Sequence, residues 1–286
     1  MKTGKETRAP KGMAEAELQA FEQQMRENER AEATIQKYMR ELHQFAAYLG
    51  TRRLDKEAVL GYRNELLEKN KPRTVNGKLS AVNAYLRFLG LERCRVRLLR
   101  LQSVHFAEEN RMLQQAEYQR LIAAAEQLKN ERMSLLMQTI GSTGIRISEL
   151  RYITLEAVKK REACISMKGK HRRVVLTKEL CRKLYAYAAK RKIRGSIFVS
   201  RSGRPLNRSN IWREMKSLCG TAHVNPEKVY PHSFRHLFAR KFYAVRHDLG
   251  YLADLLGHSS VNTTRIYTAQ SVQVHRRILE GLHLVL

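Results

Sequence analysis

Three stretches in the first third of the chain carry apolar residues at the three- and four-residue spacing of an amphipathic helix. The first predicted helix starts at Thr34, a candidate N-cap, and ends at Gly50. A second helix is predicted over 56–69, and a third starts after Thr74 and ends at Gly90. The spacing therefore predicts a helical domain in which one face of each helix packs into a shared core.

The places where this pattern lapses indicate how the chain is divided. Residues 1–12 lack apolar periodicity and contain both proline and glycine, which predicts a disordered basic tail. The helical domain then spans 13–101, the polar segment 102–111 is predicted to be a linker, and a second domain spans 112–286. The chain is long enough for each domain to have a core of its own.

The second domain combines helices with a small β-sheet. Two short strands, Ala163–Lys168 and Arg172–Thr177, are predicted to form a basic hairpin around Gly169, and Ile197–Ser200 is a candidate third strand. Helices are predicted from Gln115, over 133–140, over 145–152 after a break at 141–144, and over 231–286 with interruptions at Gly250 and 257–260. The predicted fold class is therefore mainly α, with a helical N-terminal domain and an α-rich C-terminal domain that holds a small antiparallel sheet.

Composition narrows the class of partner. The 286 residues include 54 Lys and Arg against 27 Asp and Glu, a formal net charge of +27, and Val158–Lys216 alone has 19 basic and 3 acidic residues. Because apolar runs interrupt that stretch, we expect a folded basic surface that binds nucleic acid. The four cysteines are scattered, which predicts free thiols in a reducing compartment. The sequence shows neither a signal peptide nor an apolar run of membrane length, so a cytoplasmic location without membrane contact is expected.

Four clusters of polar residues in the second domain carry candidate chemistry. They contain Arg146 with Glu149, Lys168, His232 with Arg235, and His258 followed by Tyr267. The three-residue spacing of Arg146 and Glu149 also suits an ordinary surface ion pair. His232 and His236 have the spacing of half a zinc site, but no glutamate or third ligand accompanies them, so no metal is expected.

In combination, these residue types suit phosphoryl transfer without a metal. The planar guanidinium groups of Arg146 and Arg235 can each bind two phosphate oxygens and stabilise the negative charge that grows there. Ionising a tyrosine hydroxyl at pH 7 costs about 4 kcal/mol, and nearby arginines with a histidine base would offset that cost. A lysine at a hairpin tip suits protonation of the leaving sugar oxygen. A short helix predicted over 248–256 ends at Gly257, which places His258 just beyond the helix end.

The order Arg, Lys, His-x-x-Arg, Gly-His, Tyr resembles the tyrosine recombinases, the phage-integrase family, over residues 115–267. The first domain is similar, less specifically, to the core-binding domain of that family. The resemblance implies that Tyr267 is the nucleophile, which forms a 3′-phosphotyrosyl link to DNA, and that Lys168 is the general acid for the 5′-oxygen. It implies that Arg146 and Arg235 bind the phosphate and that His258 donates a hydrogen bond to it. His232 is implied to assist proton transfer, and Glu149 to orient the site. It also implies that neither ATP nor another cofactor is needed.

The same resemblance implies double-stranded DNA as the partner and a homotetramer on two duplexes. The basic side chains expected to contact DNA are Arg73, Lys78 and Arg87 in the first domain and Lys170, Arg172 and Arg173 in the hairpin. Lys170 competes with Lys168 for the role of general acid. The amphipathic segment 272–286 is expected to pack on a neighbouring protomer, with packing on its own chain as the alternative.

The leading functional hypothesis is therefore site-specific strand exchange that integrates or excises a mobile element. A type IB topoisomerase uses similar chemistry on a similar catalytic domain and is the nearest enzymatic alternative. A catalytically silent DNA-binding protein is the alternative from another class. The target DNA sequence is not predicted, because contacts to base edges depend on docking geometry.

Overall fold

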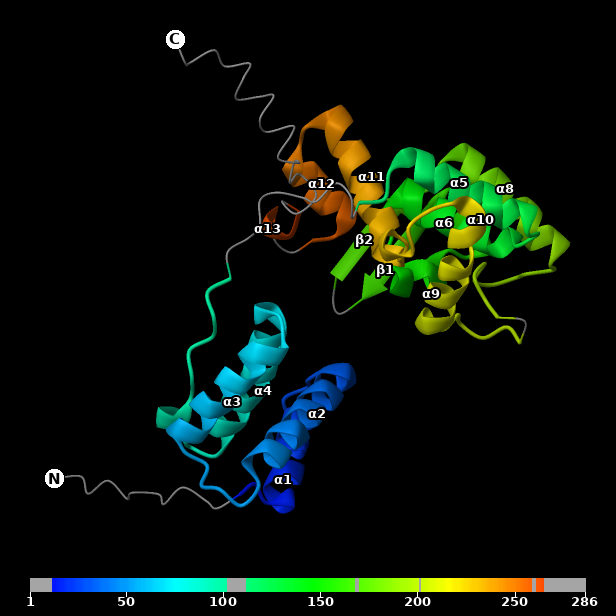
Figure 1. Ribbon diagram of the computed structural model, residues 1–286. Coiled ribbons are helices and arrows are strands. Elements are labelled where there is room, and N and C mark those ends of the chain that lie inside the picture. The colour runs from blue at the N-terminus through cyan, green and yellow to red at the C-terminus, as the bar shows by residue number, and fades with distance from the viewer. Residues whose placement is uncertain (1–11, 102–111, 168–169, 201, 259–260, 265–286) are drawn as a thin grey trace, which may run out of the picture. The chain divides into compact units, whose positions relative to one another are not determined.

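The structure, a computed structural model, divides the chain into two units, residues 1–103 and 104–286 (Figure 1). The described residues are 12–101, 112–167, 170–200, 202–258 and 261–264. The predicted fold class is confirmed, because the units are mainly helical and the second contains one two-stranded antiparallel sheet. No helix within the described ranges is long and apolar enough to cross a membrane.

The described part of the first unit consists of four helices and a short 3₁₀ helix. They are α1 (Glu15–Glu27), α2 (Glu32–Leu49), α3 (Lys56–Lys69), α4 (Pro72–Phe88) and η1 (Glu92–Cys94). The predicted bounds of α3 are confirmed. The prediction that Thr34 caps α2 is wrong: Ala31 occupies the N-cap position, so no side chain selects the start of this helix. Gly50 ends α2 with a positive φ of 57°, as its spacing predicts.

Apolar faces of all four helices meet in one core, whose fully buried members include Leu42, Phe45, Leu79 and Tyr85. The sequence pattern gives no prediction for α1, which nevertheless contributes buried side chains to this core. The predicted linker 102–111 and residues 1–11 of the predicted tail lie outside the described residues. Gly12, the last residue assigned to that tail, belongs to the folded unit, because its N–H donates to the Arg52 carbonyl at 3.0 Å.

Two asparagines of α4 fix the extended chain that leaves the first unit. The Asn83 side chain donates to the Val96 carbonyl at 2.8 Å and accepts from the Val96 N–H at 3.0 Å. Asn76 makes the same pair of bonds with Leu99, at 2.9 and 2.8 Å. Each amide thus satisfies both backbone groups of one residue, as a neighbouring strand would. Because the asparagines lie seven residues apart, they share one side of α4.

The second unit is built around α6. Its elements are α5 (Gln115–Gln127), α6 (Glu131–Thr143), η3 (Ile147–Tyr152), α7 (Leu155–Lys160), β1 (Glu162–Met167), β2 (Lys170–Val175), α8 (Lys178–Lys190), α9 (Arg208–Ser217), α10 (Cys219–Ala222), η4 (Pro226–Lys228), α11 (Pro231–Arg246), α12 (Leu249–Leu256) and α13 (Val261–Thr264). Helix α6 lies in the interior and packs on α5, α8 and α11 (Figure 1). Most side chains of α6 are therefore buried.

The structure departs from the predicted elements of this unit at several places. The break predicted at 141–144 lies instead at 144–146, because α6 continues through Thr143 and the next helix starts at Ile147. The following segment is a 3₁₀ helix. Ile197–Ser200 forms no strand in the described chain, and only Val199 makes an isolated bridge, with Pro205. Gly250 lies inside α12, and the helical pattern is broken instead at His247, which has a φ of 53°.

The predicted basic hairpin is confirmed as the antiparallel pair β1–β2. The strands pair from Glu162 opposite Val175 to Met167 opposite Lys170, so the turn falls at residues 168–169, which lie outside the described residues. Thr177, predicted to end the second strand, instead caps α8 by accepting from the Leu180 N–H. The hairpin lies at the edge of the unit (Figure 1).

Candidate active site

The C-terminal end of α12 is the centre of the candidate site. Asp248 begins the helix by accepting from the Tyr251 N–H, and Gly257 ends it in the left-handed conformation with a φ of 64°. A Cβ at Gly257 would lie 2.5 Å from Arg172 Cδ, so glycine is required here both by the backbone and by the close approach of that arginine. The sequence spacing predicted this helix end.

Three consecutive backbone carbonyls at this helix end accept hydrogen bonds from three arginines. They are Leu255 with Arg172 Nη1 at 2.6 Å, Leu256 with Arg235 Nη2 at 2.8 Å, and Gly257 with Arg146 Nη2 at 3.2 Å. The last carbonyls of a helix lack partners within the helix and carry the negative end of its dipole. Guanidinium groups from β2, α11 and the start of η3 are therefore oriented by one structural element.

Glu149 joins two of these arginines from the other side. Its Oε2 accepts from the Arg146 N–H at 2.8 Å and from Arg172 Nη2, and its Oε1 accepts from Arg146 Nη1 at 2.9 Å. The carboxylate is buried, with 3% of its surface exposed, so the pair is no ordinary surface ion pair. Burial alone would raise the pKa of Glu149, but the Arg146 N–H and the two guanidinium charges hold it below its usual value.

Arg235 lies deeper than its sequence position suggested. Its helix α11 starts with Pro231 at the first helical position, and the side chain of Arg235 is 1% exposed. Besides the Leu256 carbonyl, the guanidinium donates to the Gly144 carbonyl. Gly144 has a φ of 64°, and a Cβ there would lie 2.5 Å from Phe238 Cδ1. The glycine therefore permits both the end of α6 and the close packing of α11 beside it.

His258 completes the group, and its neighbours determine its tautomer. Its Nε2 lies 2.9 Å from Arg235 Nη2, and its Nδ1 lies 2.9 Å from the Oγ1 of buried Thr264. Because a guanidinium only donates, Nε2 accepts, and the ring proton is on Nδ1 and is donated to Thr264. Burial and the charges of Arg235 and Arg146 lower the pKa of His258 to about 4. His258 is therefore neutral at pH 7 and orients Arg235.

Two further histidines lie on the first turns of α11. The rings of His232 and His236 meet edge to face, with centroids 4.5 Å apart. Burial, then the charges of Arg235, Arg146 and Arg208, lower the pKa of His232. Burial and neighbouring positive charge lower the pKa of His236 to about 3. At pH 7 both rings are neutral, and a neutral ring can accept a proton.

The structure therefore brings together five of the residues singled out from the sequence: Arg146, Glu149, His232, Arg235 and His258. Lys168, Tyr267 and the amphipathic segment 272–286 lie outside the described residues. Lys170 begins β2, and its side chain is not among those described. Sequence reasoning missed Arg172 as a member of the group and missed Thr264 altogether.

The residues predicted to contact DNA divide into exposed and buried side chains. Arg73 and Arg87 are exposed on α4, and Arg173 on β2 is 79% exposed. Lys78, also expected to contact DNA, is only 15% exposed, because its Nζ lies 2.7 Å from Oε2 of buried Glu41. Arg172, also predicted to bind DNA, is instead 12% exposed and bound within the protein.

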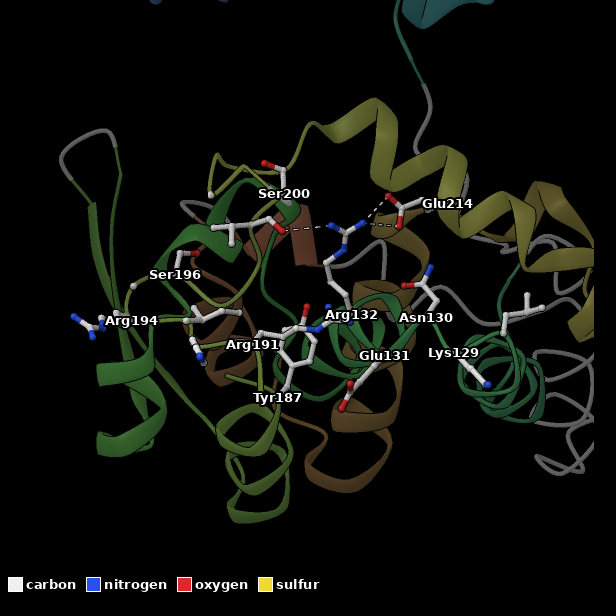
Figure 2. A pocket seen from close by; sticks show the side chains of 16 residues that line it. Lys129, Asn130, Glu131, Arg132, Tyr187, Arg191, Arg194, Ser196, Ser200 and Glu214 are labelled. Atoms are coloured by element: carbon white, nitrogen blue, oxygen red, sulfur yellow. Dashed lines mark hydrogen bonds and ion pairs between the residues drawn. The ribbon is translucent and has the colours of Figure 1, made fainter. Parts of the chain in front are cut away.

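A large cavity of about 900 Å³ lies at the opposite end of α6 from this group (Figure 2). Arg132, on the first turn of α6, donates to both carboxylate oxygens of Glu214 at 2.9 and 3.0 Å and to the Val199 carbonyl at 3.3 Å. Arg146 follows the other end of the same helix. The cavity is therefore separate from the arginine group, and the candidate site is a surface formed around the end of α12.

Comparison with known proteins agrees with this geometry. The model of the phage integrase family matches residues 111–273, and that of the phage integrase N-terminal SAM-like domain matches residues 18–93. Tyrosine recombinase XerD of Rhizobium meliloti is 28% identical over 285 residues, covering 90% of this chain and 91% of the relative. XerD of Halalkalibacterium halodurans is 25% identical over 262 residues, covering 82% and 86%.

Solved structures with the same fold include two recombinases bound to DNA. A lambda integrase dimer bound to a COC′ core site superposes with a TM-score of 0.72 at 16% identity, covering 90% of this chain and 77% of that one. The XerH site-specific recombinase bound to a palindromic difH substrate, a post-cleavage complex, gives 0.70 at 20% identity, covering 88% and 79%. At these sequence identities the similarity shows a shared fold and no more.

Proposed function

The chain belongs to the phage integrase family, whose members exchange DNA strands through a tyrosine nucleophile, and on that premise we propose that it cleaves and rejoins DNA at specific sites. The observation that carries the proposal is the set of arginines bound to the end of α12. The group holds three guanidinium charges, and the one carboxylate in it, Glu149, pairs with Arg146 and Arg172, which leaves an excess of positive charge beside the solvent-accessible Arg146. Such a preorganised cationic surface fits a phosphodiester whose negative charge increases in the transition state.

In the proposed reaction, the Tyr267 hydroxyl oxygen attacks a scissile phosphorus. A 3′-phosphotyrosyl bond forms, the bond from phosphorus to the 5′-oxygen breaks, and Lys168 delivers a proton to that oxygen. Neutral His232 takes the proton that Tyr267 loses. The 5′-hydroxyl of a partner strand then attacks the phosphotyrosyl phosphorus and gives its proton to Lys168. The bond from phosphorus to the Tyr267 oxygen breaks, and His232 returns a proton to that oxygen. Lys170 is the alternative general acid.

Arg146 and Arg235 are proposed to bind the non-bridging phosphate oxygens. Arg235 is held by two carbonyls and by His258, so little conformational entropy is lost when the phosphate binds. The predicted hydrogen bond from His258 to the phosphate requires a proton on Nε2, which accepts from Arg235 in the described state. We therefore assign His258 an orienting role before DNA binds, with a change of tautomer once phosphate takes over the Arg235 donor.

Strand exchange needs two duplexes, so we propose a homotetramer on double-stranded DNA in which segment 272–286 packs on a neighbouring protomer. The lambda integrase fold, which this chain shares, is also seen as a tetramer bound to a Holliday junction. Truncation after Thr268 is expected to prevent DNA-bound assembly, which is measured by analytical ultracentrifugation. Intact assembly of the truncated protein would contradict the exchange.

Two biological outcomes of the same chemistry are candidates. The first is integration or excision of a mobile element, in keeping with the fold shared with lambda integrase and the Tn1549 transposon integrase. The second is resolution of joined DNA copies, because XerD relatives match over most of the chain. Plasmids carrying DNA from both sides of the coding region distinguish them. Joining of two separate plasmids favours integration, and conversion of dimers to monomers favours resolution.

A nicked suicide substrate tests the chemistry. Nicked duplexes tiled across the DNA that flanks the coding region are incubated with the protein, and a covalent adduct is expected on denaturing gels. Tyr267→Phe is expected to abolish the adduct while leaving binding nearly unchanged, since one hydroxyl is lost. Relaxation of plasmids that lack a recombination site, without recombinants, indicates a topoisomerase. Binding without any adduct indicates a silent DNA-binding protein.

A further inference from the structure

Arg172 and Arg173 are neighbours in β2 but face opposite sides of the hairpin. Successive side chains of a strand alternate between its two faces. Val174 is buried and lies on the same face as Arg172, whereas Val175 is 67% exposed and lies on the face of Arg173. Arg173 pairs with Glu162 at 3.3 Å on the exposed face. One of these two basic residues is therefore directed into the protein.

The Arg172 side chain joins three elements. From β2 its Nη1 donates to the Leu255 carbonyl at the end of α12, and its Nη2 donates to Glu149 in η3. Its Cδ lies 2.5 Å from where a Cβ on residue 257 would be, so the absence of a side chain at Gly257 leaves room for the arginine. A side chain that is 12% exposed and uses donors on both terminal nitrogens internally has little capacity left for DNA.

These contacts support the two parts of the site that carry out the proposed reaction. Arg172 shares the Glu149 carboxylate with Arg146, so the charge of Glu149 is divided between two guanidinium groups. The second guanidinium offsets part of the negative potential of Glu149, so Arg146 attracts an incoming anion more strongly. β2 starts at Lys170, two residues before Arg172, and follows the turn that contains Lys168. Arg172 thus anchors the base of that turn against α12.

We propose that Arg172 is a positioning residue for strand cleavage. It fixes strand β2 of the hairpin and Arg146 against the end of α12, and it does not contact DNA phosphate. The proposal rests on the proposed function for its kinetic part. Its binding part stands independently, because a phosphate contact and an internal contact differ in their effect on the salt dependence of DNA binding.

The test compares variants of the full chain. Arg172→Gln removes the positive charge and the guanidinium group. Arg172→Lys keeps the charge and an aliphatic chain that fits beside Gly257, but its single ammonium cannot reach Glu149 and Leu255 together. Arg173→Gln represents an exposed arginine on the same strand. Arg182→Gln on α8 removes one exposed arginine that pairs with Glu179, and serves as the matched control for lost charge.

Two measurements are made on each variant. Binding to a short duplex of arbitrary sequence is followed across a range of salt concentrations. Single-turnover cleavage is followed at saturating amounts of a nicked substrate that the wild-type protein cleaves. For both Arg172 variants we expect an unchanged salt slope and a cleavage rate lower by about tenfold to hundredfold, because loss of a supporting contact misplaces the reacting groups. For Arg173→Gln we expect a shallower salt slope by about 0.9.

The pH dependence of cleavage adds a readout that loss of packing alone would not move. Without Arg172, Glu149 loses a positive neighbour and a hydrogen bond, so its pKa rises toward the usual range. The acid limb of the cleavage profile is then expected at higher pH in Arg172→Gln than in the wild type, while Arg172→Lys lies between them. An unmoved acid limb contradicts the link through Glu149.

Each failure has its own signature. A salt slope shallower by about 0.9 in Arg172→Gln identifies a phosphate contact and overturns the proposal, even if no cleavage substrate exists. A wild-type cleavage rate in both Arg172 variants also overturns it. If the wild-type protein forms no adduct with any substrate, the proposed function fails instead. Thermal unfolding of every variant is compared, and if Arg172→Gln does not fold, Arg172→Lys decides the result.

Discussion

Each unit buries one glutamate between basic residues, and the two glutamates differ in what surrounds them. Glu41 in the first unit accepts from Lys78 Nζ at 2.7 Å and from Arg40 at 2.9 Å. Glu149 in the second unit accepts from Arg146 and Arg172. The exposed fractions of the two carboxylate side chains are 7% and 3%, so both need positive partners.

The difference lies in the second set of contacts that the basic groups make. Lys78 also contacts Gln44 of α2, so its interactions link α4 to α2 within the first unit. Both arginines at Glu149 instead continue to the end of α12, where Arg235 and His258 join them. A buried ion pair is thus not by itself a sign of a functional site. It becomes one where additional oriented donors leave positive charge in excess.

Replacement of Arg235 is the strongest test of this distinction. Arg235→Lys keeps the positive charge, but a single ammonium cannot donate to two carbonyls and remain beside His258. Single-turnover cleavage is expected to fall by about 10²–10³, the cost of losing an oriented donor to transition-state charge. The rate is measured at saturating DNA on a nicked substrate.

The matched control is Arg40→Lys, which changes an arginine beside the buried glutamate of the first unit. Arg40 is 64% exposed, and its side chain donates to Glu41. Its cleavage rate is expected to equal that of the wild type. If Arg235→Lys also retained a rate within tenfold of the wild type, the arginines at α12 would not be the phosphate-binding group.

Most side chains of this site could be identified from the sequence, because several of them lie in short local motifs. The spacing of Arg146 and Glu149 and the Gly257 helix end are local features, and local spacing determines them. The backbone carbonyls that bind the arginines cannot be predicted in this way, because every residue has a backbone carbonyl. The members of that group are also separated by up to 111 residues, from Arg146 to Gly257. Tertiary packing brings them together, through α11 on α6 and α12 on α11 and β2.

The hairpin illustrates a signal that was present and ambiguous. Val174 and Leu176 alternate with exposed positions and place Arg172 on the buried face, but Val175 interrupts the alternation. Charge counting treats Arg172 and Arg173 alike. In the first unit, Lys78 lies on the polar side of a helix, and its partner Glu41 comes from another helix, so its partial burial follows from tertiary packing.

The glutamate of the first unit is expected to affect stability and not chemistry. Glu41→Gln leaves Lys78, a partly buried ammonium, without its charged partner. The free energy of unfolding is expected to fall by about 1–3 kcal/mol, measured by urea denaturation. Cleavage at saturating DNA is expected to be unchanged at a temperature where the variant is folded. Loss of cleavage in a folded Glu41→Gln protein would mean that the two glutamates do not have separate roles.

Acid should also distinguish the two units. The folded pKa of His258 is lowered to about 4 and that of His236 to about 3, both from 6.5, so unfolded chains take up these protons first. The second unit therefore loses stability as the pH falls from 6.5 toward 4. The pKa of Glu41 is lowered from 4.5, despite the opposing effect of burial, so this contribution to the first unit is lost below pH 4.5.

Scanning calorimetry of the full chain at successive pH values measures this order. The transition of the second unit is expected to move to lower temperature between pH 6.5 and 5, with that of the first unit nearly constant. His258→Gln removes one of the titrating groups and is expected to reduce the shift. Transitions that move together over this range would contradict the assignment of the buried neutral histidines to one unit.

The smallest expected effect separates two basic residues of α4. Arg73 is exposed, whereas Lys78 is 15% exposed and bound to Glu41. If Arg73 contacts a phosphate, Arg73→Gln reduces the slope of log affinity against log salt by about 0.9, because one fewer counterion is released. Lys78→Gln removes the same charge but leaves the slope unchanged, and lowers the unfolding temperature instead. Equal reductions of the slope in both variants would show that net charge governs binding to the first unit and that the burial of Lys78 does not remove it from the DNA-binding surface.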